Sequence, residues 1–323
     1  MNSDDDLTVE NAWNFLRNNH QREIPCDLLV KLQNASDRMH PESLRAMGYF
    51  YEHGISCEKD VNRAFSFYKV AASHGSASCL YNVAVMLFDD NKYSNLITQF
   101  APSARKLEAI RCWEKAASMG DSYAHVALGI AYENGDTVSK DITKAKQLYG
   151  KAMEMGNTES AFRLALLCHR AENGTDQARK CFERACELGH PLACYKLGEI
   201  VQETVPEKYA AIRESLQYFL KAADGGVPEA LEWCGEILGM GLGVPKDPQR
   251  AIAYLRKAIE ANRPRAKYIF AILLARGVDI SRDLPTAYKF AIEAKLAGID
   301  AAARLAEKLA SQLEDSDLSS KGG

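Results

Sequence analysis

The sequence lacks a long apolar run, a surplus of basic residues and a basic leader. No apolar stretch approaches the ~20 residues that a helix needs to span a bilayer, so direct membrane insertion is not expected. The formal net charge is -3, whereas nucleic-acid-binding proteins usually present a strongly basic face, so no nucleic-acid partner is expected. The start, MNSDDDL, has neither the basic nor the apolar region of a secretory signal. We therefore expect a cytoplasmic chain, or a periplasmic or secreted one if a signal was removed before the numbering begins.

Motifs for catalysis and for cofactors are also missing. There is no G-x-S-x-G nucleophile elbow, and no S-x-x-K motif accompanied by S-D-N and K-T-G. The glycines of GMGLGVPK follow no predicted strand, so they do not indicate a phosphate loop. A group of cysteines and histidines lies close in sequence, but its spacing contains no C-x-x-C and suits no zinc site. Its members are Cys168, His169, Cys181, Cys186, His190 and Cys194. We therefore predict no catalytic residue, no metal and no cofactor, and interpret the chain as a non-enzyme.

The nine cysteines are odd in number and mostly far apart. This favours free, buried thiols over a full disulfide framework.

What the sequence does contain is an internal repeat. An alanine is followed after seven residues by a second alanine and after four more by a glycine, in seven copies with two substitutions. The copies are Ala64–Ala71–Gly75, Ala109–Ala116–Gly120, Ala145–Ala152–Gly156, Ala178–Ala185–Gly189, Ser215–Ala222–Gly226, Ala251–Ala258–Asn262 and Ala287–Ala294–Gly298. The intervals between the last members are 45, 36, 33, 37, 36 and 36 residues, and an insertion within residues 89–105 accounts for the longest. Such a period is typical of stacked helical hairpins.

Each part of the repeat has a physical interpretation. Two alanines seven apart share one helical face and allow close helix packing, and the glycine ends the helix because its position requires a positive φ. A bulky residue four positions after the first alanine is expected to fill the space between helices. Asp60, Asp141, Asp247 and Asp283, four residues before that alanine, are predicted N-caps. In six of the seven copies, another small residue stands nine positions after the terminal Gly or Asn. We expect this residue to lie where the next helix packs closely against its neighbour.

The pattern resembles the Sel-one-like repeat family, relatives of the tetratricopeptide repeat. Residues 124–156, AHVALGIAYENGDTVSKDITKAKQLYGKAMEMG, match the family's spacing well, and residues 230–262 and 46–75 follow. The predicted fold is all-α: a right-handed α-solenoid of about seven helix–turn–helix repeats in residues 42–298. Residues 1–41 are predicted to form N-terminal capping helices or a degenerate repeat. Residues 299–323 are predicted to form a capping helix, over 302–313, and a polar tail from Glu314.

The resemblance implies that the first helix of each repeat lines a concave surface. We therefore expect partner-binding residues three positions before and one position after the small residue of each first helix. The candidates are Arg45, Tyr49, Tyr81, Phe162, Tyr195, Glu199, Glu232, Glu236 and Tyr268. The aromatic members would anchor a partner segment or, alternatively, pack between helices. The three glutamates would favour a basic segment or, alternatively, form a solvated face.

Cys186 and Cys194 occupy positions that are bridged in cysteine-rich secreted members of the family, and only this repeat has the pair. Two buried free thiols are the favoured interpretation, because they suit a cytoplasmic chain, and a disulfide is the alternative. The favoured function is a protein–protein interaction scaffold or adaptor that binds a protein or peptide segment on its concave face. Two alternatives are a β-lactam-interacting hydrolase of the cysteine-rich type and a regulatory subunit of a membrane-associated or degradation complex.

Overall fold

A computed structural model describes residues 3–19, 24–96, 101–135, 137–170, 175–277 and 281–321. All regular elements in these ranges are helices. The chain forms two compact units, residues 1–160 and 161–323, which are described separately. The helices of the first unit are α1 (Ser3–Asn19), α2 (Cys26–Asp37), α3 (Pro41–His53), α4 (Val61–Ser73), α5 (Ala77–Phe88), α6 (Pro102–Ser118), α7 (Ser122–Asn134) and α8 (Ile142–Glu154).

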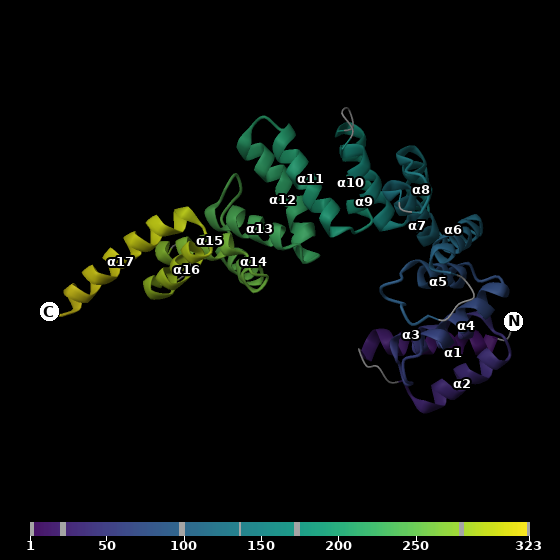
Figure 1. The fold of residues 1–323 in the computed structure, drawn as a ribbon. Coiled ribbons are helices and arrows are strands. Elements are labelled where there is room, and N and C mark those ends of the chain that lie inside the picture. The colour runs from purple at the N-terminus through teal and green to yellow at the C-terminus, as the bar shows by residue number, and fades with distance from the viewer. Residues whose placement is uncertain are drawn as a thin grey trace. The chain divides into compact units, whose positions relative to one another are not determined.

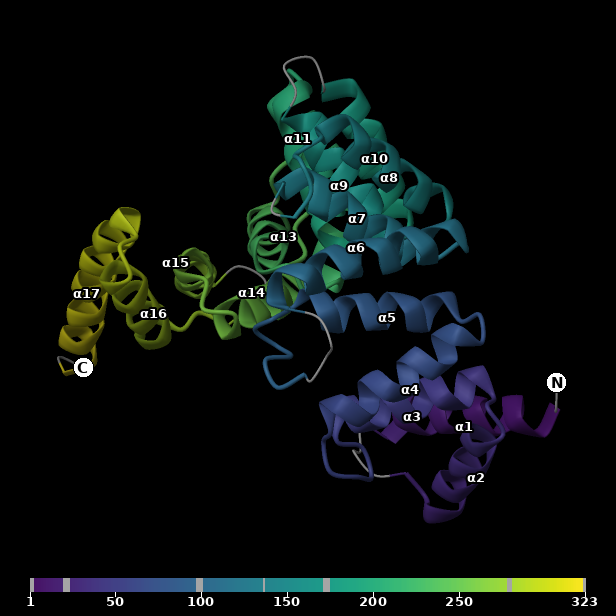
Figure 2. The same cartoon turned by 45° about the vertical axis from the view of Figure 1, so that its right-hand side comes forward.

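Helix α9 (Thr158–His169) begins in the first unit and ends in the second. The helices that follow are α10 (Thr175–Glu187), α11 (Pro191–Thr204), α12 (Lys208–Asp224), α13 (Pro228–Met240), α14 (Pro248–Glu260), α15 (Pro264–Arg276), α16 (Leu284–Leu296) and α17 (Asp300–Lys321). Consecutive helices pack as hairpins, among them α3 with α4, α7 with α8, α11 with α12, α13 with α14, and α15 with α16 (Figures 1 and 2). The prediction of an all-α chain of helical hairpins is confirmed.

The second helix of four hairpins begins at the predicted aspartate caps. The carboxylate of Asp60 accepts hydrogen bonds of 3.0 Å from the backbone N–H groups of Asn62 and Arg63. Asp141, Asp247 and Asp283 accept equivalent bonds at 2.9, 3.1 and 3.0 Å. Each bond satisfies an amide that has no partner within the helix, and such caps typically contribute ~1 kcal/mol.

The residues that close the repeat adopt the backbone conformation that the sequence predicts. All six terminal glycines have positive φ, from 80° at Gly226 to 90° at Gly75. Asn262, which replaces glycine in one copy, has φ 58°, and asparagine is one of the few non-glycine residues that tolerate this region. The chain therefore leaves each second helix through a left-handed residue.

The small residues allow the two helices of a hairpin to touch. Every alanine of the seven Ala–Ala pairs, and Ser215 in its place, has no exposed surface. A Cβ added to Gly48 would lie 2.6 Å from Cε1 of Tyr68, and a Cβ on Gly198 would lie 2.5 Å from Cε1 of Phe219. The predicted bulky residues thus fill the space over a glycine of the same hairpin. A residue larger than glycine at that position would occupy the space that the ring needs.

Both ends of the chain are helical. Helices α1 and α2 occupy the predicted N-terminal cap and pack on α3. Helix α17 begins at Asp300 and continues to Lys321, so the segment predicted as a polar tail is helical from Glu314 to Lys321. The segment contains no glycine or proline before residue 322, and nothing else in its sequence stops a helix.

Part of the insertion in residues 89–105 is packed onto the first unit. Tyr93 and Leu96 are buried, and the Tyr93 hydroxyl donates a 2.6 Å hydrogen bond to Glu52. The Glu52 carboxylate also accepts hydrogen bonds of 3.0 Å from Tyr68 and Lys92. Residues 97–100 of the insertion lie outside the described residues.

Candidate functional site

In the first unit, two candidate residues contact the N-terminal cap. The Arg45 guanidinium lies 5.0 Å from the centre of the Trp13 ring, and the Tyr49 ring lies 5.2 Å from the same ring. Because Trp13 belongs to α1, these side chains hold the capping helix against α3.

Tyr81 on α5 is half-buried beside Tyr123 of α7, with 5.9 Å between the ring centres. Burial, followed by the nearby charge of Asp121, raises the pKa of Tyr81. Tyr123 itself is 62% exposed. This pair leaves one aromatic ring accessible on the first unit.

In the second unit, the candidate aromatic residues are half-buried, and two of them, Phe162 and Tyr195, contact other rings. Phe162 stacks on His190 at 4.2 Å, and Tyr195 lies 5.7 Å from Phe219. Burial, followed by the hydrogen bond and charge of Glu199, raises the pKa of Tyr195 to about 12. These rings therefore serve helix packing and also keep part of their surface accessible.

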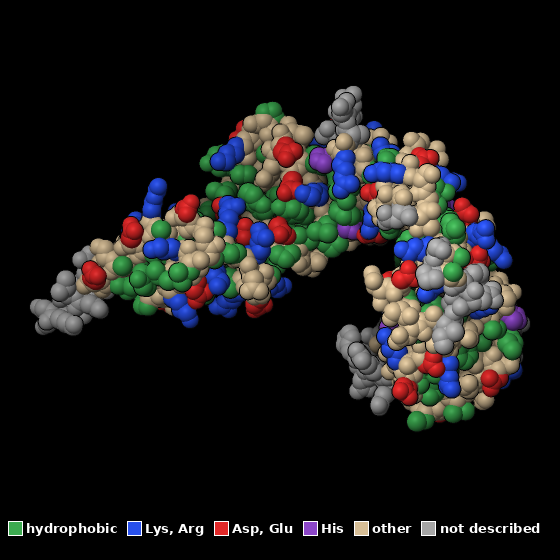
Figure 3. All heavy atoms as spheres, in the orientation of Figure 1, with side chains coloured by type: hydrophobic (Ala, Val, Ile, Leu, Met, Phe, Trp, Pro, Cys, Tyr) green, Lys and Arg blue, Asp and Glu red, His purple; other side chains and the backbone are tan. Residues whose placement is uncertain are grey.

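The candidate glutamates are already paired with basic residues. Arg263 Nε lies 3.3 Å from Glu232 Oε2, and Arg265 Nη2 lies 2.6 Å from Glu236 Oε2, while Lys196 Nζ lies 2.7 Å from Glu199. Figure 3 shows basic and acidic side chains next to one another over α13–α15. Since Glu232 is buried and its charge is compensated, this network does not favour a basic partner segment.

A pocket of about 600 Å³ lies between α15 and α17. Helix α15 is the first helix of its hairpin, the type that the sequence assigns to partner binding, and α17 is the predicted capping helix that follows that hairpin. We use the term first-helix face for the surface of the second unit formed by α11, α13, α15 and α17. Tyr268, the last candidate, lines the pocket with Ile272 of the same helix.

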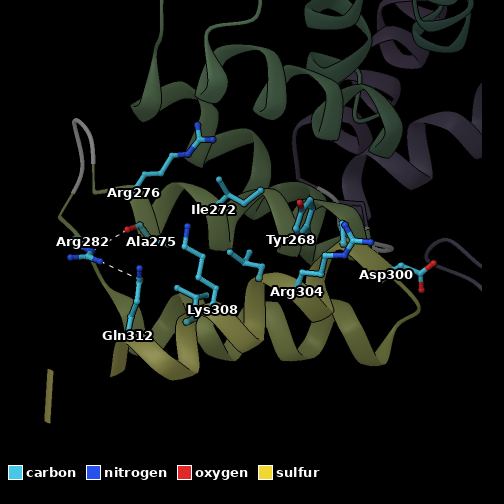
Figure 4. A pocket seen from close by; sticks show the side chains of 12 residues that line it. Tyr268, Ile272, Ala275, Arg276, Arg282, Asp300, Arg304, Lys308 and Gln312 are labelled. Atoms are coloured by element: carbon cyan, nitrogen blue, oxygen red, sulfur yellow. Dashed lines mark hydrogen bonds between the residues drawn. The ribbon is translucent and has the colours of Figure 1, made fainter. Parts of the chain in front are cut away.

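The rim of this pocket is basic. Figure 4 shows Arg304 and Lys308 rising from α17 toward Tyr268 and Ile272 of α15. Arg276 and Arg282 also line it, and Asp300 is its one acidic residue. Arg282 donates hydrogen bonds to the Ala275 carbonyl at 3.1 Å and to Gln312 Oε1 at 3.3 Å.

The two cations of α17 were missed, although the sequence rule could have found them. Gly298 leads by nine residues to Glu307, which is not small, so the register was not continued there. Arg304 stands three positions before Glu307 and Lys308 stands one after it. The spacing that marks the candidate positions therefore continues into α17, although the small residue itself is replaced there by Glu307.

Cys186 and Cys194 form a disulfide, with their Cα atoms 4.8 Å apart. The other seven cysteines form no disulfide. Burial raises the pKa of Cys79 to about 11 and that of Cys234 to about 12, so at neutral pH both are thiols, which are poor nucleophiles.

The described residues contain neither a cluster of metal ligands nor a membrane-spanning helix. No three His, Cys, Asp or Glu side chains converge as metal ligands in this part of the chain. Within the same ranges, no helix has the length and apolar character needed to cross a bilayer.

Similar proteins include regulators of a biosynthetic enzyme. Chitin synthase regulatory factor 3 of Schizosaccharomyces pombe is 26% identical over 329 residues, which cover 98% of this chain and 34% of that protein. Chitin synthase regulator SKT5 of Saccharomyces cerevisiae is 25% identical over 255 residues, which cover 74% of this chain and 35% of that protein. The chain thus spans about a third of the length of these two relatives.

A solved structure has the same fold. The crystal structure of a protective antigen of uropathogenic Escherichia coli, displaying an SLR fold, superposes with a TM-score of 0.70 at 21% identity, covering 95% of this chain and 64% of that one. The sequence model of the Sel1 repeat matches residues 41–76, 105–121, 122–157, 158–190, 191–227 and 228–262, together more than half of the chain. The chain therefore belongs to the Sel1 repeat family.

Proposed function

We propose that this chain is a non-catalytic adaptor that binds a segment of a partner protein on the first-helix face. The observation that carries the proposal is the pocket between α15 and α17, because it combines an accessible aromatic wall with four cationic side chains that form no ion pair in the described residues. A partner segment that enters it would also pass Tyr195 and the Trp233–Arg265 pair, whose ring centre and guanidinium lie 5.1 Å apart. Aromatic and arginine side chains are the residue types that most often carry binding energy.

A second, more specific role is that of a regulatory subunit of a membrane-associated enzyme. The names of the two fungal relatives support it. Because this chain covers only about a third of each, the role is proposed for the shared repeat region. Adding the purified chain to membranes that contain chitin synthase, and measuring chitin formation, tests it: a change in rate supports the role, and an unchanged rate counts against it.

The β-lactam hydrolase alternative has little support in the observed cysteine chemistry. One disulfide is present, and the buried thiols of Cys79 and Cys234 are protonated at neutral pH. Nitrocefin hydrolysis above the buffer rate would revive this alternative.

The adaptor proposal is tested by selecting random peptides on the immobilised chain. Selected peptides should lose at least tenfold in affinity for the Tyr195→Ala/Tyr268→Ala variant, which removes two half-buried rings from the first-helix face. The matched control is Tyr254→Ala/Tyr288→Ala, which removes two half-buried tyrosines from the second helices α14 and α16. Circular dichroism must show native helicity for both. Failure to select any peptide, or equal losses in both variants, would count against the proposal.

A further inference from the structure

The charge balance on the first-helix face changes between α13 and α17. The carboxylates of α13 are paired: Glu229 with Arg263 at 2.8 Å, Glu232 with Arg263 at 3.3 Å, and Glu236 with Arg265 at 2.6 Å. One hairpin later, four cationic side chains and a single carboxylate surround the pocket. The basic excess is therefore confined to the α15–α17 end of this face.

These four positive charges are not neutralised by the fold. Arg304 and Lys308 are exposed and form no hydrogen bond or ion pair with any residue in the described ranges. Arg282 donates only to the uncharged oxygens of Ala275 and Gln312, and Arg276 donates to the Met240 sulfur at 3.3 Å. An anionic ligand would meet cations that need not first break an ion pair.

An apolar strip runs beside the charges. Tyr268 and Ile272 from α15 and Leu305 from α17 are half-buried, and Leu309, which also lines the pocket, has 1% of its surface exposed. An inorganic anion would use the cations and leave this strip bare. A ligand that uses both must carry an apolar group next to its negative charges.

The dimensions suit a short peptide. Arg304, Lys308 and Gln312 lie at successive intervals of four residues on one face of α17, which corresponds to about 12 Å along the helix axis. An extended chain advances about 3.3 Å per residue, so about four residues of a partner lie within the pocket. Alternate side chains of such a segment point to opposite sides, which places carboxylates toward the cations and an apolar side chain toward the strip.

We propose that the pocket between α15 and α17 binds an extended acidic segment of a partner protein, with carboxylates on Arg304 and Lys308 and an apolar side chain against Tyr268 and Ile272. This inference rests on the adaptor function and specifies the chemistry of the segment. The guanidinium group suits it, because its planar fork donates two parallel hydrogen bonds to one carboxylate. Binding should weaken at high salt, since the contacts lie at an exposed rim.

The test uses fluorescein-labelled peptides and fluorescence anisotropy with the full chain. The probe GDEFDEG offers four carboxylates and one ring. It should bind the wild type, and Arg304→Glu/Lys308→Glu should weaken binding at least tenfold. The matched control is Arg256→Glu/Lys289→Glu, which makes the same charge change at exposed positions of α14 and α16 and should leave binding within twofold. Arg304→Gln/Lys308→Gln repeats the test without charge reversal, in case the first variant does not fold.

Two further probes separate the contributions. The amide peptide GNQFNQG should bind at least tenfold more weakly than the acidic one, and GDEGDEG, which lacks the ring, should bind several-fold more weakly. Equal affinity of the acidic and amide peptides would overturn the proposal. So would equal losses in the α17 variant and its control, or binding of inorganic phosphate or of phosphatidylserine vesicles at the same cations without binding of the peptide.

The outcome also separates this proposal from the adaptor function. If selection enriches neutral or basic peptides whose binding ignores Arg304 and Lys308, the acidic-segment proposal fails while the adaptor function survives. If selection enriches no peptide, the adaptor function itself fails.

Discussion

Leu255 of α14 packs over Gly235 of α13 so closely that a Cβ at Gly235 would lie 2.5 Å from Leu255 Cγ. Leu255 has no exposed surface and cannot move outward without opening the hairpin. The same relationship joins Gly48 to Tyr68, Gly129 to Tyr149, and Gly198 to Phe219. Contact between a glycine and a large side chain is thus the repeated packing element of these hairpins.

Substitution of Gly235 should therefore destabilise the second unit. Gly235→Ala is expected to lower the free energy of unfolding by ~1–3 kcal/mol, and Gly235→Leu by more, because added atoms overpack a closed contact. Chemical denaturation followed by circular dichroism measures this. The control is Gly150→Ala in α8, where an added Cβ meets no atom within 4 Å. There the higher helix propensity of alanine should stabilise by ~0.5–1 kcal/mol. A neutral Gly235→Ala would contradict the packing account.

The hairpins could be predicted from sequence because their determinants are local. A cap such as Asp141 acts on amides of its own helix, and Gly75 or Asn262 is selected by its own φ. Close packing within a hairpin also recurs at a fixed interval, as Gly48 and Tyr68 show.

The pairing of charged side chains in the candidate site could not be predicted in the same way. Arg263 and Arg265 precede or begin α15 and reach back to α13, about 30 residues earlier. Which side chains meet depends on how adjacent hairpins pack, and the repeat spacing does not specify it. The same spacing, extended past Gly298, would have indicated Arg304 and Lys308.

The stability of the first unit should depend on pH through Glu52. Burial alone would raise the pKa of Glu52, but hydrogen bonds from Tyr93, Lys92 and Tyr68 outweigh burial and lower the pKa below its ordinary value of 4.5. A folded-state pKa below the unfolded one means that the ionised carboxylate stabilises the fold above pH 4.5. This stabilisation is lost as the pH falls from 4.5 through the folded-state pKa.

Urea denaturation between pH 7 and pH 3.5 measures this dependence. Glu52→Gln should lower the free energy of unfolding at pH 7 by ~1–3 kcal/mol, because it removes a charged acceptor of three donors, of which Tyr68 and Tyr93 are buried. The same substitution should also reduce the fall in the free energy of unfolding as the pH drops below 4.5. Glu58→Gln, at an exposed carboxylate without an ion pair in the described residues, should leave the decline unchanged. If the free energy of unfolding of Glu52→Gln fell with pH as steeply as that of the wild type, another titrating group would be responsible for the pH dependence.

The Glu232 pairing should matter more for stability than an exposed ion pair does. Glu232→Ala is expected to destabilise by ~1–3 kcal/mol, because it removes a buried carboxylate and leaves Arg263 and Arg265 with fewer partners. Glu187→Ala, which breaks an exposed pair with Arg184, should cost less than ~1 kcal/mol. Thermal unfolding compares the two, and equal shifts in melting temperature would argue against a structural role for the network.

The disulfide should be visible by counting thiols. When the air-oxidised chain is denatured without reductant and alkylated, mass spectrometry should find seven modified cysteines of the nine, and Cys186 and Cys194 in one linked peptide. Because the bridge closes a loop of eight residues, its reduction should lower stability by about 2 kcal/mol. Nine alkylated cysteines would mean that the two thiols are free.

Binding on the first-helix face is tested most directly by photocrosslinking with a selected peptide. A benzophenone amino acid is placed at position 268, in the pocket wall, or at position 209, an exposed tyrosine of the second helix α12. Our account predicts a crosslink to the peptide from position 268 and none from position 209. Crosslinks from position 209 alone would place the partner on the opposite helices and contradict the account.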